Sequence, residues 1–199
     1  MTLSSPKSRF GMARYRWLNT VVILGSVLHC LLLLPARLPG MELLGVTPNW
    51  LLVWVVAWSL KRNQWESAIA GLTLGLLQDA MTSPYPTHTI GLVLVALLTN
   101  RIQKQRFIQE DFISVAIIVF GMVVLAQTTI AFQVTLHKLL QPQSLYPAFT
   151  AIWQQHQRIV LSSAILTSLW APVLYYPLNQ WWRYFAQRTA PPVNSQNPL

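Results

Sequence analysis

The chain has 199 residues, of which 53% are hydrophobic and only 10% are charged, and 14 Lys and Arg against 5 Asp and Glu give a formal net charge of +9. Soluble domains carry about 25% charged residues, so this composition argues against a soluble enzyme. The single cysteine excludes a disulfide scaffold, and the hydrophobic content excludes a disordered chain. What remains is an all-α integral membrane protein.

Six apolar stretches follow one another along the chain and are predicted to be transmembrane helices. A helix that crosses a bilayer needs about 20 mostly apolar residues, or about 17 at the short end. The predicted spans are residues 18–34, 44–60, 65–81, 88–100, 112–134 and 159–176. They divide the chain into a basic N-terminus (1–16), a six-span domain (17–182) and a tail that is expected to be disordered (183–199).

The second predicted span carries tryptophans at a spacing of four, Trp50, Trp54 and Trp58, so they share one helix face. Such a stripe is typical of a face toward lipid or the membrane interface, and a ligand-stacking box is the alternative. Pro48 is expected in the first turns of this helix, where its missing N–H is tolerated.

The third predicted span contains Gly71-x3-Gly75-x3-Asp79, whose members lie on one helix face. Two glycines allow another helix to approach closely, and a carboxylate inside a bilayer needs a partner, water or a proton. Three interpretations of Asp79 stay open: a helix-end carboxylate held by the turn at Thr82-Ser83, a clamp between the third and fourth spans, or a ligand or proton site.

The last third of the chain combines apolar spans with polar interruptions. Residues 127–129 are polar within the fifth span and favour hydrogen bonds to a neighbouring helix. Residues 136–157 are polar with interleaved aromatic side chains, which predicts a segment lying at the membrane surface. Pro172 predicts a kink in the sixth span.

The basic residues lie in short clusters between the apolar stretches, which disfavours a nucleic-acid surface. Six spans place both termini on one side of the membrane. If that side is the cytoplasm, it holds every Lys and Arg except Arg37, Lys138 and Arg158. The excess of positive charge in cytoplasmic loops therefore predicts an N-in, C-in topology.

Nothing in the chain is typical of an enzyme, a cofactor site or a metal site. The histidines are dispersed, with no His-x3-His pair, and there is no Gly-x-Ser-x-Gly elbow or Walker-type loop. Asp79 is the only acid well inside a predicted span, so the second carboxylate of an intramembrane aspartyl protease is missing. We predict a non-enzymatic protein without cofactors.

Three pieces of the chain together resemble the rod shape-determining protein MreD family. They are Pro48-Asn49 opening a span that closes with Lys61-Arg62, the Gly-, Leu- and Asp-containing stretch 70–79, and a proline-rich break before His88-Thr89-Ile90-Gly91-Leu92. The resemblance covers roughly residues 44–100. The family more usually has Pro-Asp where this chain has Pro48-Asn49.

The resemblance implies a non-enzymatic, multi-pass protein of the bacterial plasma (inner) membrane that maintains rod shape within the cell-wall elongation machinery. The implied partners are the bitopic protein MreC, the actin homologue MreB, and the glycosyltransferase and transpeptidase that build the lateral wall. The family's fold looks like that of the substrate-binding subunits of energy-coupling-factor transporters, so a vitamin-type binding subunit is the alternative. The candidates for helix packing or partner binding are Pro48, Asn49, Gly71, Gly75, Asp79, His88 and Gly91.

Overall fold

Six α-helices form the protein in a computed structural model that describes residues 6–36, 40–43, 45–82, 85–104, 112–140 and 145–189. The helices are α1 (Pro6–Leu33), α2 (Trp50–Ser59), α3 (Gln64–Met81), α4 (Thr89–Lys104), α5 (Phe112–Leu139) and α6 (Leu145–Thr189). The described ranges contain no strand, only an isolated bridge between Leu43 and Val46. The prediction of an all-α fold is confirmed.

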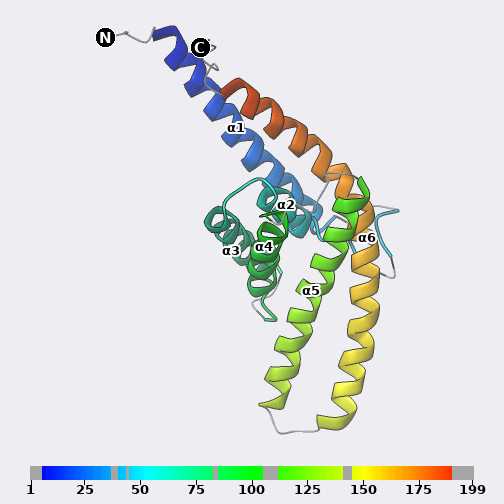
Figure 1. Cartoon of the computed structure of the whole chain (residues 1–199). Helices are drawn as coiled ribbons and strands as arrows, with labels where there is room; N and C mark the ends of the chain where they lie inside the picture. The colour runs from blue at the N-terminus through cyan, green and yellow to red at the C-terminus, as the bar shows by residue number, and fades with distance from the viewer. Residues whose placement is uncertain are drawn as a thin grey trace, which may run out of the picture.

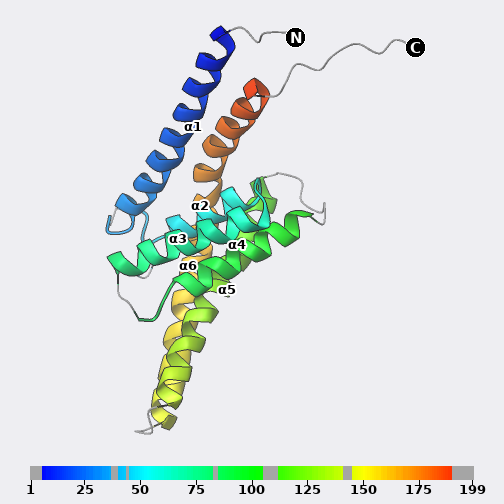
Figure 2. The same ribbon diagram turned by 90° about the vertical axis from the view of Figure 1, so that its left-hand side faces the viewer.

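The helices are arranged in three parts along the molecule (Figure 1, Figure 2). The start of α1 and the end of α6 extend toward one end, α2, α3 and α4 lie across the middle, and α5 with the first part of α6 forms a hairpin toward the other end. The most extensive pairings are α3 with α4 and α5 with α6.

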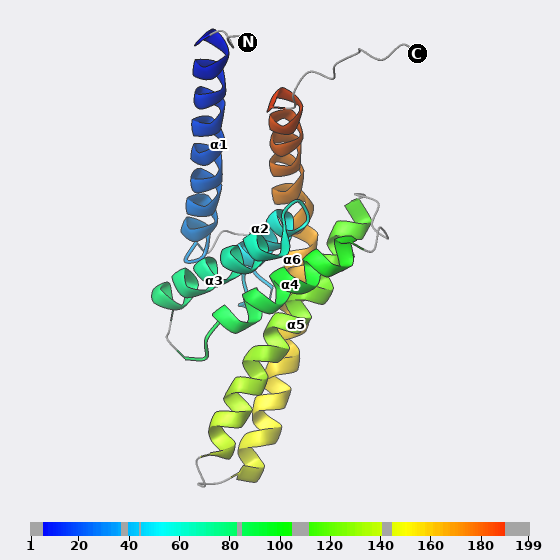
Figure 3. The same ribbon diagram turned by 60° about the vertical axis from the view of Figure 1, so that its left-hand side comes forward.

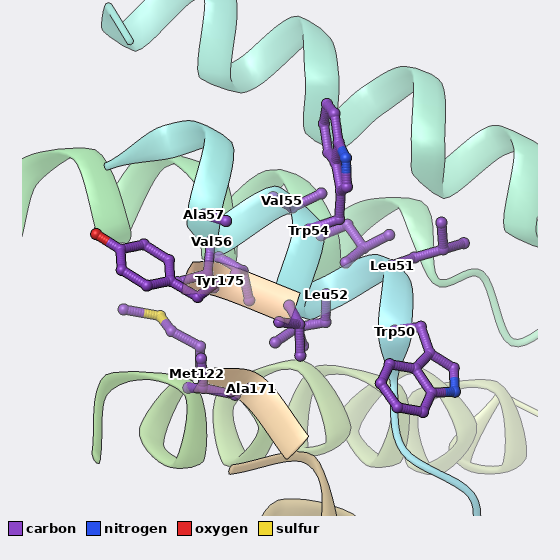
Figure 4. Close-up of a cluster of buried hydrophobic side chains, with 14 of the residues drawn as sticks. Trp50, Leu51, Leu52, Trp54, Val55, Val56, Ala57, Met122, Ala171 and Tyr175 are labelled. Atoms are coloured by element: carbon purple, nitrogen blue, oxygen red, sulfur yellow. The ribbon is translucent and has the colours of Figure 1, made fainter. Parts of the chain in front are cut away.

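Helix α2 is the centre of the core. It has only ten residues, nine of them buried, and it contacts all five other helices. A helix that is apolar on every side is one that protein surrounds, and a run of this length is too short to cross a bilayer alone. Figure 4 shows its side chains packed with Met122 of α5 and with Ala171 and Tyr175 of α6.

The tryptophans of α2 belong to this core, so the expected stripe facing lipid is wrong. Trp50 and Trp54 are buried. Trp50 meets Trp170 of α6 edge to face, with ring centroids 6.0 Å apart, and Trp54 donates its indole N–H to Ser26 Oγ of α1 at 2.9 Å. The ligand-stacking alternative has no support either, because protein side chains occupy these positions.

The predicted second span, 44–60, is longer than the helix that forms. Gly45 adopts a φ of +79°, and Leu43 and Val46 exchange backbone hydrogen bonds of 3.0 Å, which makes a turn that is incompatible with a helix. Pro48 therefore precedes α2 and does not lie in its first turns, and Leu44 falls outside the described residues. The turn shortens the helix to the ten residues that the core encloses.

The other helix ends differ most from prediction where the chain is polar. Within the predicted surface segment 136–157, residues 136–139 complete α5 and residues 145–157 begin α6, because polarity does not interrupt backbone hydrogen bonding, whereas 141–144 lie outside the described residues. Residues 183–189, expected to be disordered, complete α6, whereas 190–199 lie outside the described residues. Helix α1 likewise begins at Pro6, within the basic N-terminus, and α4 continues past residue 100 to Lys104.

Two helices are long and apolar enough to cross a membrane by length and composition, over Phe112–His137 in α5 and His156–Gln187 in α6. Shorter apolar helices cover Trp17–Leu33, Trp50–Ser59 and Thr89–Gln103, among the described residues. Helix α6 contains Pro172 and Pro177, and Figure 1 shows that it changes direction along its length. Prolines inside a helix remove backbone hydrogen bonds and permit such a bend.

Candidate functional site

Asp79 lies at the centre of a polar cluster between the end of α3 and the start of α4. Its Oδ1 accepts the backbone N–H of His88 at 2.6 Å and lies 2.9 Å from His88 Nδ1. Its Oδ2 accepts the hydroxyls of Thr87 and Thr89 at 2.8 and 2.7 Å, and the backbone N–H of Thr89 at 3.3 Å. We call Asp79, Thr87, His88, Thr89 and Gln133, described below, the Asp79 junction.

The carboxylate of Asp79 acts as a cap for another helix. Helix α4 begins at Thr89, and the first N–H groups of a helix have no acceptor within the helix itself. Asp79 supplies that acceptor and places negative charge at the positive end of the α4 dipole. The geometry therefore favours a clamp between α3 and α4. Thr82 does not hold Asp79, because its hydroxyl donates to the Gln78 carbonyl at 2.9 Å, and Ser83 lies outside the described residues.

Gln133 of α5 completes the junction, and the sequence analysis did not single it out. Its side-chain amide accepts the N–H of Thr87 at 3.1 Å and donates to the Thr87 carbonyl at 2.9 Å. Its backbone carbonyl accepts the Tyr85 hydroxyl at 2.7 Å. The hydroxyls of Thr128 and Thr129, where such bonds were expected, bond instead to carbonyls of their own helix. The available signal in the sequence was that Gln133 is a polar residue in an apolar helix, one turn beyond Thr129.

The two glycines of α3 allow α4 to pack against it backbone to backbone. A Cβ atom at Gly75 would overlap Thr89 Cα, and one at Gly71 would lie 2.8 Å from the Leu92 carbonyl oxygen and 3.1 Å from Ala96 Cβ. The contacts with Thr89 Cα and with the Leu92 carbonyl oxygen are both shorter than a real Cβ atom allows, so α3 or α4 would have to move. Gly91 packs on the opposite side of α4, where a Cβ would lie 3.4 Å from Ala126 Cα of α5.

Pro48 and Asn49 belong to a second junction, between α2 and α6. Asn49 is the N-cap of α2, since its Oδ1 accepts the N–H of Leu52 at 3.1 Å. Its own N–H donates to the hydroxyl of Thr167, a fully buried residue of α6, at 3.0 Å. Asn and Asp are similarly effective N-caps, so the amide of Asn49 caps α2 as well as a carboxylate would.

We expect Asn49→Asp to change the free energy of unfolding by less than about 0.5 kcal/mol and Asn49→Ala to lower it by about 1 kcal/mol, because only alanine removes the cap. Thermal unfolding of the purified variants in detergent measures the difference. Both replacements lack the side-chain NH2 group of asparagine, but only alanine lacks the capping oxygen. Equal losses of stability would therefore show that the NH2 group, and not the cap, stabilises the protein.

Asn100 forms a third polar contact that sequence reasoning missed. It is buried in α4, and its Nδ2 donates to the carbonyls of Ser59, at 3.2 Å, and Arg62 in the turn between α2 and α3. The sequence placed Asn100 at the end of the fourth span, where a polar residue needs no special explanation. Its role becomes visible only once α4 is seen to continue beyond it.

The structure thus brings Gly75, Asp79 and His88 together at one junction. Gly71 and Gly91 lie further along the same packed helices, and Asn49, preceded by the buried Pro48, forms a separate contact with α6. The Asp79 junction is built to hold three helices in register, because its donors and acceptors satisfy one another. Within the described ranges no three His, Cys, Asp or Glu side chains gather in a way that could hold a metal ion.

Comparison with known proteins gives one family. The family model described as rod shape-determining protein MreD matches residues 14–180, which include every helix in whole or in large part. Searches of curated proteins and of solved structures give no match.

Proposed function

This chain belongs to the rod shape-determining protein MreD family, and we propose that it is a non-enzymatic scaffold of the bacterial cell-wall elongation machinery. Membership of the family gives it a role in rod shape determination, as a membrane protein associated with the shape-determining system. The observation that carries the proposal is the family match over residues 14–180. The family match supports the role in shape determination, and the packing of the helices supports the proposal that the protein acts as a scaffold.

The packing suits a scaffold because the polar Asp79 junction lies between helices while α3 leaves large apolar side chains exposed. The Asp79 junction fixes α3, α4 and α5 to one another. Another face of α3 exposes large apolar side chains at helical spacing, Trp65, Ile69, Leu72 and Leu76. A rigid helix with such a face is suited to contact lipid and the transmembrane helices of other proteins.

We further propose a multi-pass arrangement in the plasma membrane with both termini in the cytoplasm. The first residues of α1 and the last residues of α6 extend toward the same end of the molecule (Figure 2, Figure 3), and the turn between α2 and α3, with Lys61 and Arg62, lies on that side. The hairpin of α5 and α6 extends toward the opposite end. This arrangement supports the positive-inside orientation.

The proposed topology predicts opposite labelling of two engineered cysteines. In Arg158→Cys the thiol is expected to react with a membrane-impermeant maleimide in cells with a permeabilised outer envelope. In Arg101→Cys it is expected to react only after the plasma membrane is broken. Both positions are exposed, and the native Cys30 is fully buried and gives little background. The reverse labelling pattern would invert the topology.

The proposed partners are MreC, MreB and the glycosyltransferase and transpeptidase of lateral wall synthesis. A photo-crosslinking residue in place of exposed Leu72 is expected to capture MreC, whereas the same residue in place of buried Leu74 is not. Immunoblotting for MreC reads out the adduct. Lipid adducts alone at Leu72 and at the exposed positions of α1 and α5 would contradict a scaffold that contacts MreC through its membrane helices.

No observation favours the alternative of a vitamin-type binding subunit. That function required Asp79, His88 and the tryptophan face of α2 to line one cavity. The structure gives Asp79 and His88 their partners in the α3–α4 connection and gives the tryptophans theirs in α1 and α6.

A further inference from the structure

We propose that the protein binds the phosphate of an anionic phospholipid headgroup where the end of α2 meets the last part of α6. The site consists of Trp58, Arg62 and Trp182, which we call the tryptophan–arginine site. The inference rests on the proposed membrane location but not on the scaffold role.

Arg62 is held in a position that suits a phosphate. Its guanidinium lies 4.6 Å from the centre of the Trp58 ring, and Trp58 is itself stacked on Trp54 with centroids 5.2 Å apart and planes 13° from parallel. A guanidinium that stacks through its face keeps its N–H donors, which lie in its plane, available for two parallel bonds to a phosphate.

Arg62 also keeps most of its hydrogen-bonding capacity. Among the described residues it meets a carboxylate at Glu66, through Nε at 3.7 Å, which is longer than a good hydrogen bond. Its side chain is 37% exposed, so a headgroup at the surface of the molecule can reach it. The two terminal nitrogens are the groups that a bidentate phosphate contact uses.

Two indole N–H groups at the site lack an acceptor among the described residues. They are Nε1 of Trp58 and of Trp182, each buried as an atom. The Trp182 ring packs edge to face against Trp58 with centroids 5.6 Å apart, and Trp182 is 9% exposed overall. A buried donor without an acceptor is unfavourable, and indole groups near a membrane interface bond to oxygen at their polar end. In the structure these nitrogens are closed to the surroundings, so a phosphate or ester oxygen reaches them only when the headgroup displaces part of the ring packing beside Arg62.

The position and charge of the site favour a lipid over a soluble anion. Figure 3 shows the turn between α2 and α3 beside α6, on the side of the α2–α4 layer toward which α1 extends. Lys61 and Arg183 flank the site in sequence, so its charge is positive against the single carboxylate of Glu66. Aromatic residues together with basic residues at the end of apolar helices are typical of the headgroup region.

Lipid binding by the purified protein in nanodiscs tests the proposal. Phosphatidylglycerol is titrated into phosphatidylcholine discs, and the lipid that stays bound is counted by native mass spectrometry. Arg62→Gln is expected to weaken phosphatidylglycerol retention by more than about tenfold, because it removes the bidentate phosphate contact together with the roughly fivefold attraction that any basic residue near a membrane surface contributes. Arg101→Gln removes an exposed charge on α4 and is expected to weaken retention by at most about that fivefold factor. Trp182→Phe keeps an aromatic ring, removes the N–H, and is expected to weaken retention while the cation–π stack remains.

Three results would overturn the proposal. Equal losses in Arg62→Gln and Arg101→Gln would show general charge attraction. Displacement of the lipid by millimolar inorganic phosphate would show an adventitious ion only. Equal retention of phosphatidylglycerol and phosphatidylcholine would show no anionic headgroup site. The crosslink from position 72 to MreC is unaffected by Arg62→Gln, so failure of lipid binding is distinguishable from failure of the scaffold.

Discussion

Replacing Gly75 with leucine is expected to destabilise the protein by about 3 kcal/mol and to remove most of it from the membrane. A Cβ atom at Gly75 overlaps the backbone of Thr89, the first residue of α4. Backbone cannot rotate out of the way as a flexible side chain can, so α3 and α4 have to separate. That separation also pulls Thr89 away from Asp79 and breaks the junction on which α4 is capped.

Gly121→Leu is the matched control for this change. Gly121 lies in α5, and a Cβ atom there meets nothing within 4 Å. Thermal unfolding in detergent, membrane abundance and the recovery of MreC by co-purification compare the two variants. At matched membrane abundance, Gly75→Leu is expected to lose MreC recovery and Gly121→Leu to keep it. Unchanged stability and recovery in Gly75→Leu would contradict the close packing of α3 on α4.

Replacing Asp79 with leucine is expected to destabilise the protein by about 3–5 kcal/mol. Leucine leaves the hydroxyls of Thr87 and Thr89 and the backbone N–H of His88 without their acceptor. These donors are partly buried, so each one left unpaired costs about 1 kcal/mol or more, toward the low end of the range of about 1–3 kcal/mol for buried donors. The same change removes the negative charge from the start of α4.

Asp79→Asn is expected to be milder, with a loss of about 1–2 kcal/mol. Its remaining oxygen can take the Oδ1 position and accept the His88 N–H. Its NH2 group then meets two hydroxyls, which can turn to accept a hydrogen bond. Chemical denaturation of the variants in detergent and their membrane abundance give the order. An equal loss in Asp79→Asn and Asp79→Leu would mean that the charge itself, not the hydrogen bonding, holds the junction.

The sequence identified the α3–α4 contact because its residue types have few uses inside an apolar helix. Glycines four residues apart permit close approach, and a lone carboxylate needs donors, so Gly71, Gly75 and Asp79 on one face indicated a partner helix. The sequence did not distinguish the clamp from the other two interpretations. The donors that decide between them come from Thr87, His88 and Thr89, and their position depends on how the connection folds.

Helix α2 shows why other features were not predictable. An apolar stretch has the same hydropathy whether lipid or protein surrounds it. Hydropathy therefore predicted a membrane span with an exposed tryptophan face, whereas the structure has a buried helix of ten residues. Gln133 and Asn100 were missed for a related reason. The sequence around a single amide side chain in a helix does not indicate which group it will bond to. Gln133 and Asn100 each bond to backbone groups more than 35 residues away.

Depletion of the protein from a rod-shaped host, followed by imaging of cell shape, shows whether this protein maintains rod shape. Depleted cells are expected to become round, wild-type protein and Gly121→Leu are expected to restore rods, and Gly75→Leu is not. Cells that remain rods on depletion and instead require an added vitamin for growth would contradict a role in shape determination.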